Sequence, residues 1–184
     1  MTQIAFLKNQ ILDYAWGSKT LLSDFLGEAH SYGAPQAELW MGSHPKAPSV
    51  LEDEALPLGK WIHRDPKAIL GEKAAAEFHN ELPFLFKVLA VENPLSLQAH
   101  PNARQAKTGF EHENKAGIPL DARERNYKDS QAKPEMLCAL SDFWVLCGFR
   151  SAADILRILQ VLKVPELANL SSLLQQPVLG NTLK

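Results

Sequence analysis

Short apolar runs with strand-like patterning dominate the first 150 residues of the chain, and a helical pattern follows them. Runs of about four to eight residues that are rich in branched and aromatic side chains are typical of strands. The predicted strands cover 11–16, 37–45, 82–91, 93–101, 135–140 and 143–149. A Ser-Asp pair separates the last two runs and favours a hairpin turn, so we expect these two strands to pair.

Helices are predicted between the strands. Residues 18–26 and 65–80 carry apolar side chains at helical spacing. An Asp-Pro pair at the start of the second stretch suits a helix cap and first position, whereas Gly71 weakens the middle. The polar segment 102–132 predicts a short helix and a long loop.

Residues 151–175 carry an apolar stripe at helical spacing and predict two helices, the second of which begins at Pro165. One helix alone does not bury such a stripe. We therefore expect the helices to pack on each other and to leave an apolar patch through which the chain self-associates. The helical segment stops at 179–184 without an obvious partner layer, which indicates a domain that is cut short.

The order of the elements predicts the fold class. Strands followed by helices favour a mainly-β fold, a β-barrel or β-sandwich with an appended α-helical segment. We expect residues 1–150 to form the first domain and residues 151–184 to begin a helical domain.

Composition and charge exclude several classes of protein. The 184 residues are 46% hydrophobic and 22% charged with a net charge of -2, which is ordinary for a globular chain and excludes a nucleic-acid footprint. A membrane span and a secretion signal are not expected, because no long apolar run exists. Cys138 and Cys147 lie in apolar runs and are predicted to be buried free thiols of a cytoplasmic protein.

Polar side chains alternate along residues 93–101, which follow a buried strand. With a period of two, Ser96, Gln98 and His100 share one face. The other face is apolar and is expected to pack on the core: Leu95, Leu97 and Ala99. This pattern places an imidazole and an amide side by side, which raises the question of metal binding.

A divalent ion accepts such mixed ligands, because neutral imidazole is a common metal ligand and an amide oxygen is a rarer one. A carboxylate is needed as well, and Glu135 at the start of a predicted strand offers it, with Lys133 beside it. A lone Gln-x-His pair also occurs on a solvated sheet face, and Lys87 can extend from a strand end into solvent. The tryptophans are interpreted as core residues, and four histidines are predicted to face solvent: His30, His63, His79 and His112.

Six blocks of sequence change this balance, and they are residues 14–19, 37–49, 82–89, 93–101, 116–129 and 133–136. Each block alone is a weak signal, whereas the ordered set is specific. Together they resemble the N-terminal part of the type I phosphomannose isomerase family, and the similarity runs from about residue 9 to residue 150.

The resemblance implies a cupin-type β-barrel that carries one zinc ion per chain. It places the metal ligands at Gln98, His100 and Glu135 and a proton-transfer role at Lys133. It also implies four substrate-binding residues. Trp16 and Glu38 line the pocket, and Lys87 and Ser96 meet the phosphate. The family's fourth ligand, a histidine, and its catalytic arginine belong to a second cupin half that this chain lacks.

The implied reaction interconverts mannose 6-phosphate and fructose 6-phosphate through a cis-enediol, a step of carbohydrate metabolism and GDP-mannose biosynthesis. A proton must leave the carbon next to the carbonyl, and negative charge develops on oxygen. A zinc ion stabilises that charge as a Lewis acid, and a nearby base moves the proton. The expected partner is therefore a small sugar phosphate.

Two departures from the family pattern favour a second hypothesis. The family usually has histidine before the lysine of its Lys-Pro-Glu block, and here Ala132 takes that place. The chain also lacks the second half. The alternative is a non-catalytic cupin module that binds a metal or a sugar phosphate, and we expect the isolated chain to have little or no isomerase activity.

Overall fold

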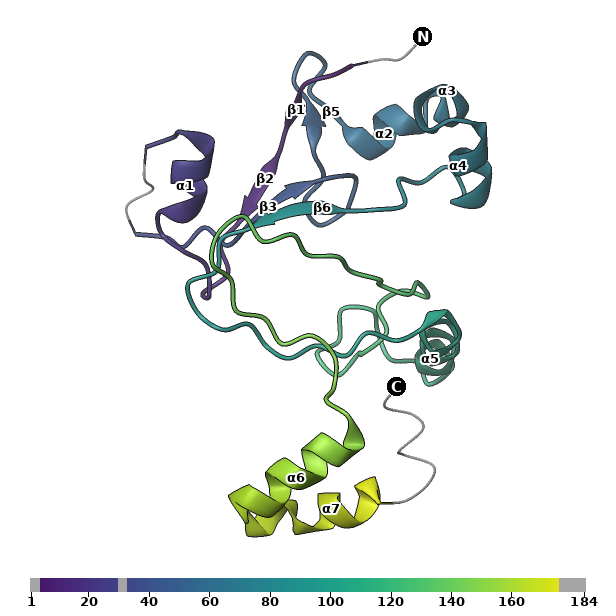
Figure 1. Ribbon diagram of the computed structural model, residues 1–184. Helices are drawn as coiled ribbons and strands as arrows, with labels where there is room; N and C mark the ends of the chain where they lie inside the picture. Colours follow the sequence, from purple (N-terminus) through teal and green to yellow (C-terminus); the bar gives the residue numbers. More distant parts are fainter. Residues whose placement is uncertain (1–3, 30–32, 176–184) are drawn as a thin grey trace. The chain divides into compact units, whose positions relative to one another are not determined.

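The computed structural model describes residues 4–29 and 33–175, in two compact parts that cover residues 1–99 and 100–184 (Figure 1). His30 and the chain end at 176–184 lie outside the described residues, whereas the other three histidines predicted to face solvent are exposed.

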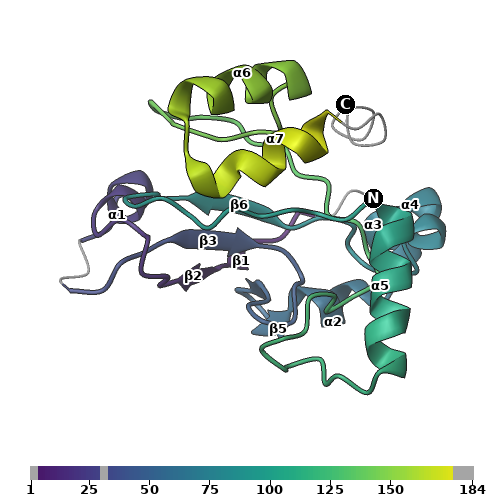
Figure 2. The same ribbon diagram turned by 90° about the horizontal axis from the view of Figure 1, so that it is seen from below.

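The first part is built on two small antiparallel sheets (Figures 1 and 2). In one, β3 (Glu38–Met41) lies between β2 (Gln10–Leu12) and β6 (Phe86–Leu89). In the other, β4 (Val50–Leu51) lies between β1 (Leu7–Lys8) and β5 (Leu56–Pro57). The strands predicted at 11–16, 37–45 and 82–91 are confirmed in shortened form.

The register of the larger sheet separates an apolar face from a polar one. Leu39 faces Ile11 on one side and Val88 on the other, and this row packs against the fully buried Leu22. Leu22 belongs to α1 (Leu21–Leu26), which lies within the helix predicted over 18–26. Because successive residues of a strand point to opposite faces, the neighbours of Leu39 point away from this core.

The smaller sheet has its own core. Leu51 packs with Leu58 and Ile62 of α2 (Leu58–Ile62), and Trp61 lies against this cluster. The stretch predicted as one helix over 65–80 is instead two, α3 (Pro66–Leu70) and α4 (Glu72–Glu77). Gly71 interrupts it with a φ of +85°, a backbone conformation that side chains disfavour.

The second part contains one long helix and a helical hairpin. The helix α5 (Ala103–Lys115) starts with a capping box between Asn102 and Gln105, and a loop follows, as predicted for 102–132. The hairpin consists of α6 (Ala152–Leu162), the short 3-10 turn η1 (Pro165–Leu167) and α7 (Ala168–Leu174).

The helical hairpin leaves an apolar patch. The helices α6 and α7 pack on each other, as the apolar stripe predicted (Figure 2). Several apolar side chains nevertheless stay exposed, among them Val161, Leu162, Leu170 and Leu173. The expected apolar patch is therefore present on the described residues.

The strand predictions for 93–101, 135–140 and 143–149 are wrong, because these segments are neither strands nor helices. Trp144 and Met136 are 98% and 97% exposed. Cys138 and Cys147 are exposed rather than buried, and Leu97 does not pack on the core. The physical reason is pairing: a strand's backbone groups need partners, and an isolated hairpin is marginal in water.

The architecture of the described residues is thus sheet plus helix, with small antiparallel sheets. Within 4–29 and 33–175, no helix has the length and apolar character needed to cross a membrane.

Candidate functional site

The polar face of the larger sheet carries two of the predicted site residues, Glu38 and Lys87. Glu38 is 7% exposed, and its Oε2 lies 3.4 Å from the Nζ of Lys87. The same oxygen accepts a hydrogen bond from the indole Nε1 of Trp40. Trp40 stands directly opposite Lys87 in the register, and the Lys87 ammonium lies 4.6 Å from the centre of its ring. The buried carboxylate is therefore paired by a cation and an N–H donor.

Aromatic rings and a second lysine extend this cluster. The ring of Trp16 stacks on that of Tyr14 at 5.8 Å between centres. The Lys46 ammonium donates to the Tyr14 hydroxyl and lies 5.7 Å from the centre of the Trp40 ring. The His44 ring meets Trp40 edge-on at 5.0 Å.

The cluster places two ammonium groups and one carboxylate around an indole. The excess positive charge suits an anion, and the aromatic faces suit the C–H groups of a sugar ring or a further cation. Tyr14 and Lys46 were not predicted as site residues from the sequence. Their positions could have indicated them, because Lys46 lies in the loop directly after β3 and Tyr14 is two residues before Trp16.

Ser96 and Gln98 lie in the exposed segment that ends the first part of the chain. The expected alternation of a polar and an apolar face is not formed there, since Leu97 is 84% exposed.

In the second part, His100 and Glu135 come together from distant places in the sequence. The Nδ1 of His100 lies 3.7 Å from the Oε2 of Glu135. The His100 side chain is 29% exposed and the Glu135 side chain is 71% exposed. Lys133 turns to a different partner, because its Nζ lies 2.7 Å from the Oδ2 of Asp129.

The chemistry of this pair fits a divalent metal ion. An imidazole nitrogen and a carboxylate oxygen are both ordinary zinc ligands. Among the described residues, no group of three His, Cys, Asp or Glu side chains gathers to form a metal site.

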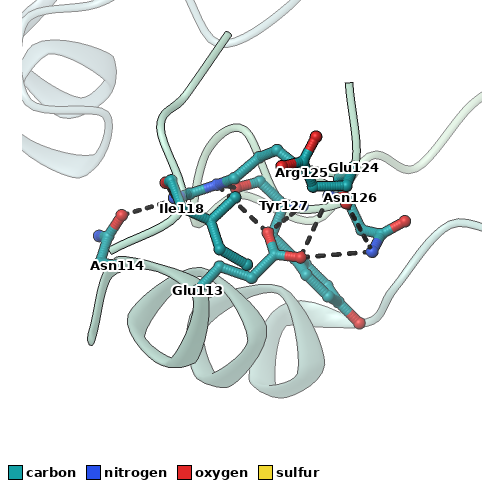
Figure 3. Close-up of polar contacts among 7 residues, drawn as sticks. All are labelled: Glu113, Asn114, Ile118, Glu124, Arg125, Asn126 and Tyr127. Carbon is teal, nitrogen blue, oxygen red and sulfur yellow. Dashed lines mark hydrogen bonds and ion pairs between the residues drawn. The ribbon is translucent and has the colours of Figure 1, made fainter. Parts of the chain in front are cut away.

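A buried ion pair lies between the candidate metal ligands in the sequence (Figure 3). The Glu113 carboxylate of α5 lies 3.2 Å from the Nε of Arg125, and the side chains are 9% and 1% exposed. Burial raises the pKa of Glu113, but hydrogen bonds from Tyr127 and Asn126 and the charge of Arg125 outweigh this effect. The pKa of Glu113 therefore lies below its ordinary value.

Comparison with known proteins adds a family. Residues 4–152 match the model of the phosphomannose isomerase type I catalytic domain. Mannose-6-phosphate isomerase of Salmonella typhimurium is 49% identical over 157 residues, which cover 84% of this chain and 40% of that protein. The Escherichia coli protein of the same name is 45% identical over 174 residues, covering 93% of this chain and 44% of that one.

Solved structures agree with the sequence relatives. A mannose 6-phosphate isomerase bound with zinc and yttrium matches with a TM-score of 0.76 at 50% identity, over 84% of this chain and 39% of that one. The Salmonella typhimurium enzyme bound to the substrate F6P and zinc matches with the same values. The chain thus spans about two fifths of the length of the curated relatives it matches first.

Proposed function

The chain belongs to the type I phosphomannose isomerase family, and from this we propose that it supplies the N-terminal part of a zinc-dependent isomerase. The enzyme would interconvert mannose 6-phosphate and fructose 6-phosphate. The observation that carries the proposal is the approach of His100 to Glu135, since two candidate metal ligands from separate family blocks meet at 3.7 Å.

Gln98, His100 and Glu135 would hold one zinc ion. When bound, zinc supplies Lewis-acid stabilisation of negative charge on substrate oxygen. The Nδ1 of His100 faces the Oε2 of Glu135 at 3.7 Å, so these two candidate ligands lie close enough to share one ion. In the family, a histidine of the second cupin half adds the fourth ligand.

Lys133 is the proposed base and acid. The reaction needs one group that takes a proton from the carbon beside the carbonyl and returns it to the neighbouring carbon, by way of a cis-enediol. The Lys133 ammonium forms an ion pair with Asp129, and an ammonium group cannot accept a proton. Lys133 must therefore leave this ion pair as a neutral amine before it can act as the base. Release from Asp129 is therefore part of the proposed role.

Lys87 and Ser96 would meet the phosphate, and Trp16 and Glu38 would line the sugar pocket. Lys87 shares its charge with Glu38, so a phosphate would compete with that carboxylate for the ammonium. The ring of Trp16 offers a stacked aromatic surface to the sugar.

The finer structural expectations rest on the same family. We infer that the small sheets belong to a cupin-type barrel. The predicted division into residues 1–150 and 151–184 and the predicted cytoplasmic location stay predictions.

A non-catalytic metal or sugar-phosphate module is the second candidate. Ala132 favours it, because the family's histidine at this position is adjacent to the proposed base. In this case the chain binds zinc but does not turn over substrate.

Zinc binding and isomerase activity of the 184-residue chain test the proposal together. We expect one zinc per chain and turnover far below the usual range of about 1 to 1000 per second. The variants H100Q and E135Q should lose zinc. The matched control is H63Q, because His63 also contacts a carboxylate, that of Glu81 at 3.1 Å. Equal zinc binding by all four chains would refute the proposed site.

A further inference from the structure

Each nitrogen of the Arg125 guanidinium group has a hydrogen-bond partner (Figure 3). Its Nε donates to the carbonyl oxygen of Tyr127 at 2.7 Å. One terminal nitrogen donates to the side-chain oxygen of Asn114 at 2.6 Å, and the other donates to the carbonyl oxygen of Ile118. Together with the Glu113 carboxylate, these partners engage all three nitrogens of the guanidinium group.

Glu113 is equally well satisfied. Its Oε2 accepts the backbone N–H of Tyr127 at 2.8 Å. Its Oε1 accepts the backbone and side-chain N–H groups of Asn126 at 3.1 and 3.3 Å. A buried ion pair is tolerated when such additional hydrogen bonds complete it, and removal of one partner leaves an uncompensated charge.

The Tyr127 ring packs closely against α5 at Gly109. A Cβ atom added at Gly109 would lie 2.5 Å from carbons of this ring, so the close approach requires glycine. Glycine in a helix interior normally destabilises it by roughly 1 kcal/mol relative to alanine. Gly109 is therefore explained by the contact with Tyr127, and not by the needs of α5.

These contacts join the two chain segments that lead to the candidate metal ligands. The helix α5 begins directly after Asn102, two residues beyond His100, and ends shortly after Glu113. Tyr127 lies two residues before Asp129, which holds Lys133. The chain then reaches Glu135, 35 positions after His100, and the Glu135 carboxylate lies beside the His100 ring.

We propose that the Glu113–Arg125 clamp, defined as this ion pair with Tyr127 seated on Gly109, is a positioning device for the metal ligands His100 and Glu135. The inference rests on the proposed zinc site. A long loop between two ligands loses conformational entropy when both bind one ion, and the loss grows with loop length. The clamp and α5 remove most of that freedom beforehand, so the ligands meet at little further cost.

The first test is R125K in the 184-residue chain. Lysine keeps the positive charge but cannot supply the planar set of donors. We expect zinc affinity, measured by competition with a chelator, to fall about threefold, because each doubling of a free loop between the ligands costs about 0.6 kcal/mol. The matched control is R157K, because Arg157 forms an exposed ion pair with Asp154 in the same part of the chain, and its affinity should not change.

The second test, G109A, leaves all charges in place and covers the case in which R125K does not fold. Alanine should displace the Tyr127 ring, lower zinc affinity in the same direction and change the visible spectrum of bound Co²⁺, while circular dichroism shows that α5 is retained. Folded G109A or R125K with unchanged affinity and spectrum overturns the clamp's role.

H100Q and E135Q separate this inference from the proposed function. If these two variants lose zinc while the clamp variants retain it, the metal site stands and the clamp is only structural. If they retain zinc as well, the metal site itself is wrong, and the clamp has no ligands to position.

Discussion

In the larger sheet, β3 is paired along both of its edges, whereas residues 135–149 form no ladder at all. Both regions are rich in branched, aromatic and other apolar side chains. They differ in what surrounds them: Leu39 has Ile11, Val88 and Leu22, while Trp144 and Met136 face solvent. The difference teaches that an apolar strand pattern becomes a strand only where backbone partners and a second apolar layer are both available.

Hydrogen exchange gives the largest contrast between these regions. We expect the amides of residues 38–41 to exchange only through global unfolding, because β3 is paired along both edges and global unfolding of a domain of this kind costs about 5 to 15 kcal/mol. Amides of 136–149 should exchange almost as in an unfolded chain. Strong protection in 136–149 would mean that this segment is paired after all.

Core truncation sharpens the same contrast. Leu22→Ala should lower the free energy of unfolding by about 2 to 5 kcal/mol, because Leu22 is fully buried. Leu146→Ala is the matched control and should change it by less than about 0.5 kcal/mol, since Leu146 is exposed. Urea denaturation measures both. A large effect at Leu146 would show that the segment packs against something.

Self-association tests whether a second copy of the chain covers the exposed apolar side chains. We expect sedimentation at several concentrations to show association through the α6–α7 patch, because isolated apolar patches of this kind attract one another. Val161→Asp should weaken association several-fold, whereas Val145→Asp in the extended segment should not. A larger effect of Val145→Asp than of Val161→Asp would place the contact in residues 135–149. A monomer at every concentration would contradict self-association.

The pH dependence of stability tests the buried ion pair of Glu113 and Arg125. Because the folded pKa of Glu113 lies below its unfolded value, its contribution to stability is present above the unfolded pKa, near 4.5. This contribution is lost as the pH falls through the folded pKa. The stability difference between the chain and E113Q should therefore shrink below about pH 4.5. A difference that stays constant from pH 7 to 3 would contradict the lowered pKa.

Several elements were predictable because their signals are local. Asp65 caps α3 through the Ala68 N–H at 3.1 Å, and Pro66 is its first residue, as the sequence indicated. The hairpin of α6 and α7 followed from the apolar stripe. Gly71 was predicted to weaken a helix, and in the structure it separates α3 from α4 because its backbone adopts a positive φ.

Parts of the candidate site were not predictable, since they depend on residues that approach from elsewhere in the chain. The polar row of Trp40 and Lys87 depends on strand register, and Lys46 reaches Tyr14 from a loop. Asp129 as the partner of Lys133 depends on the path of the loop before it. A period-two pattern carries none of this information.

The family blocks, the helix caps and the types of side chain available for chemistry could be predicted from the sequence, because each depends on residues close together in the chain. The tertiary structure was needed to show which strand patterns became strands and which charges paired. Those outcomes depend on pairing and burial between distant segments, whose free energies no single segment contains.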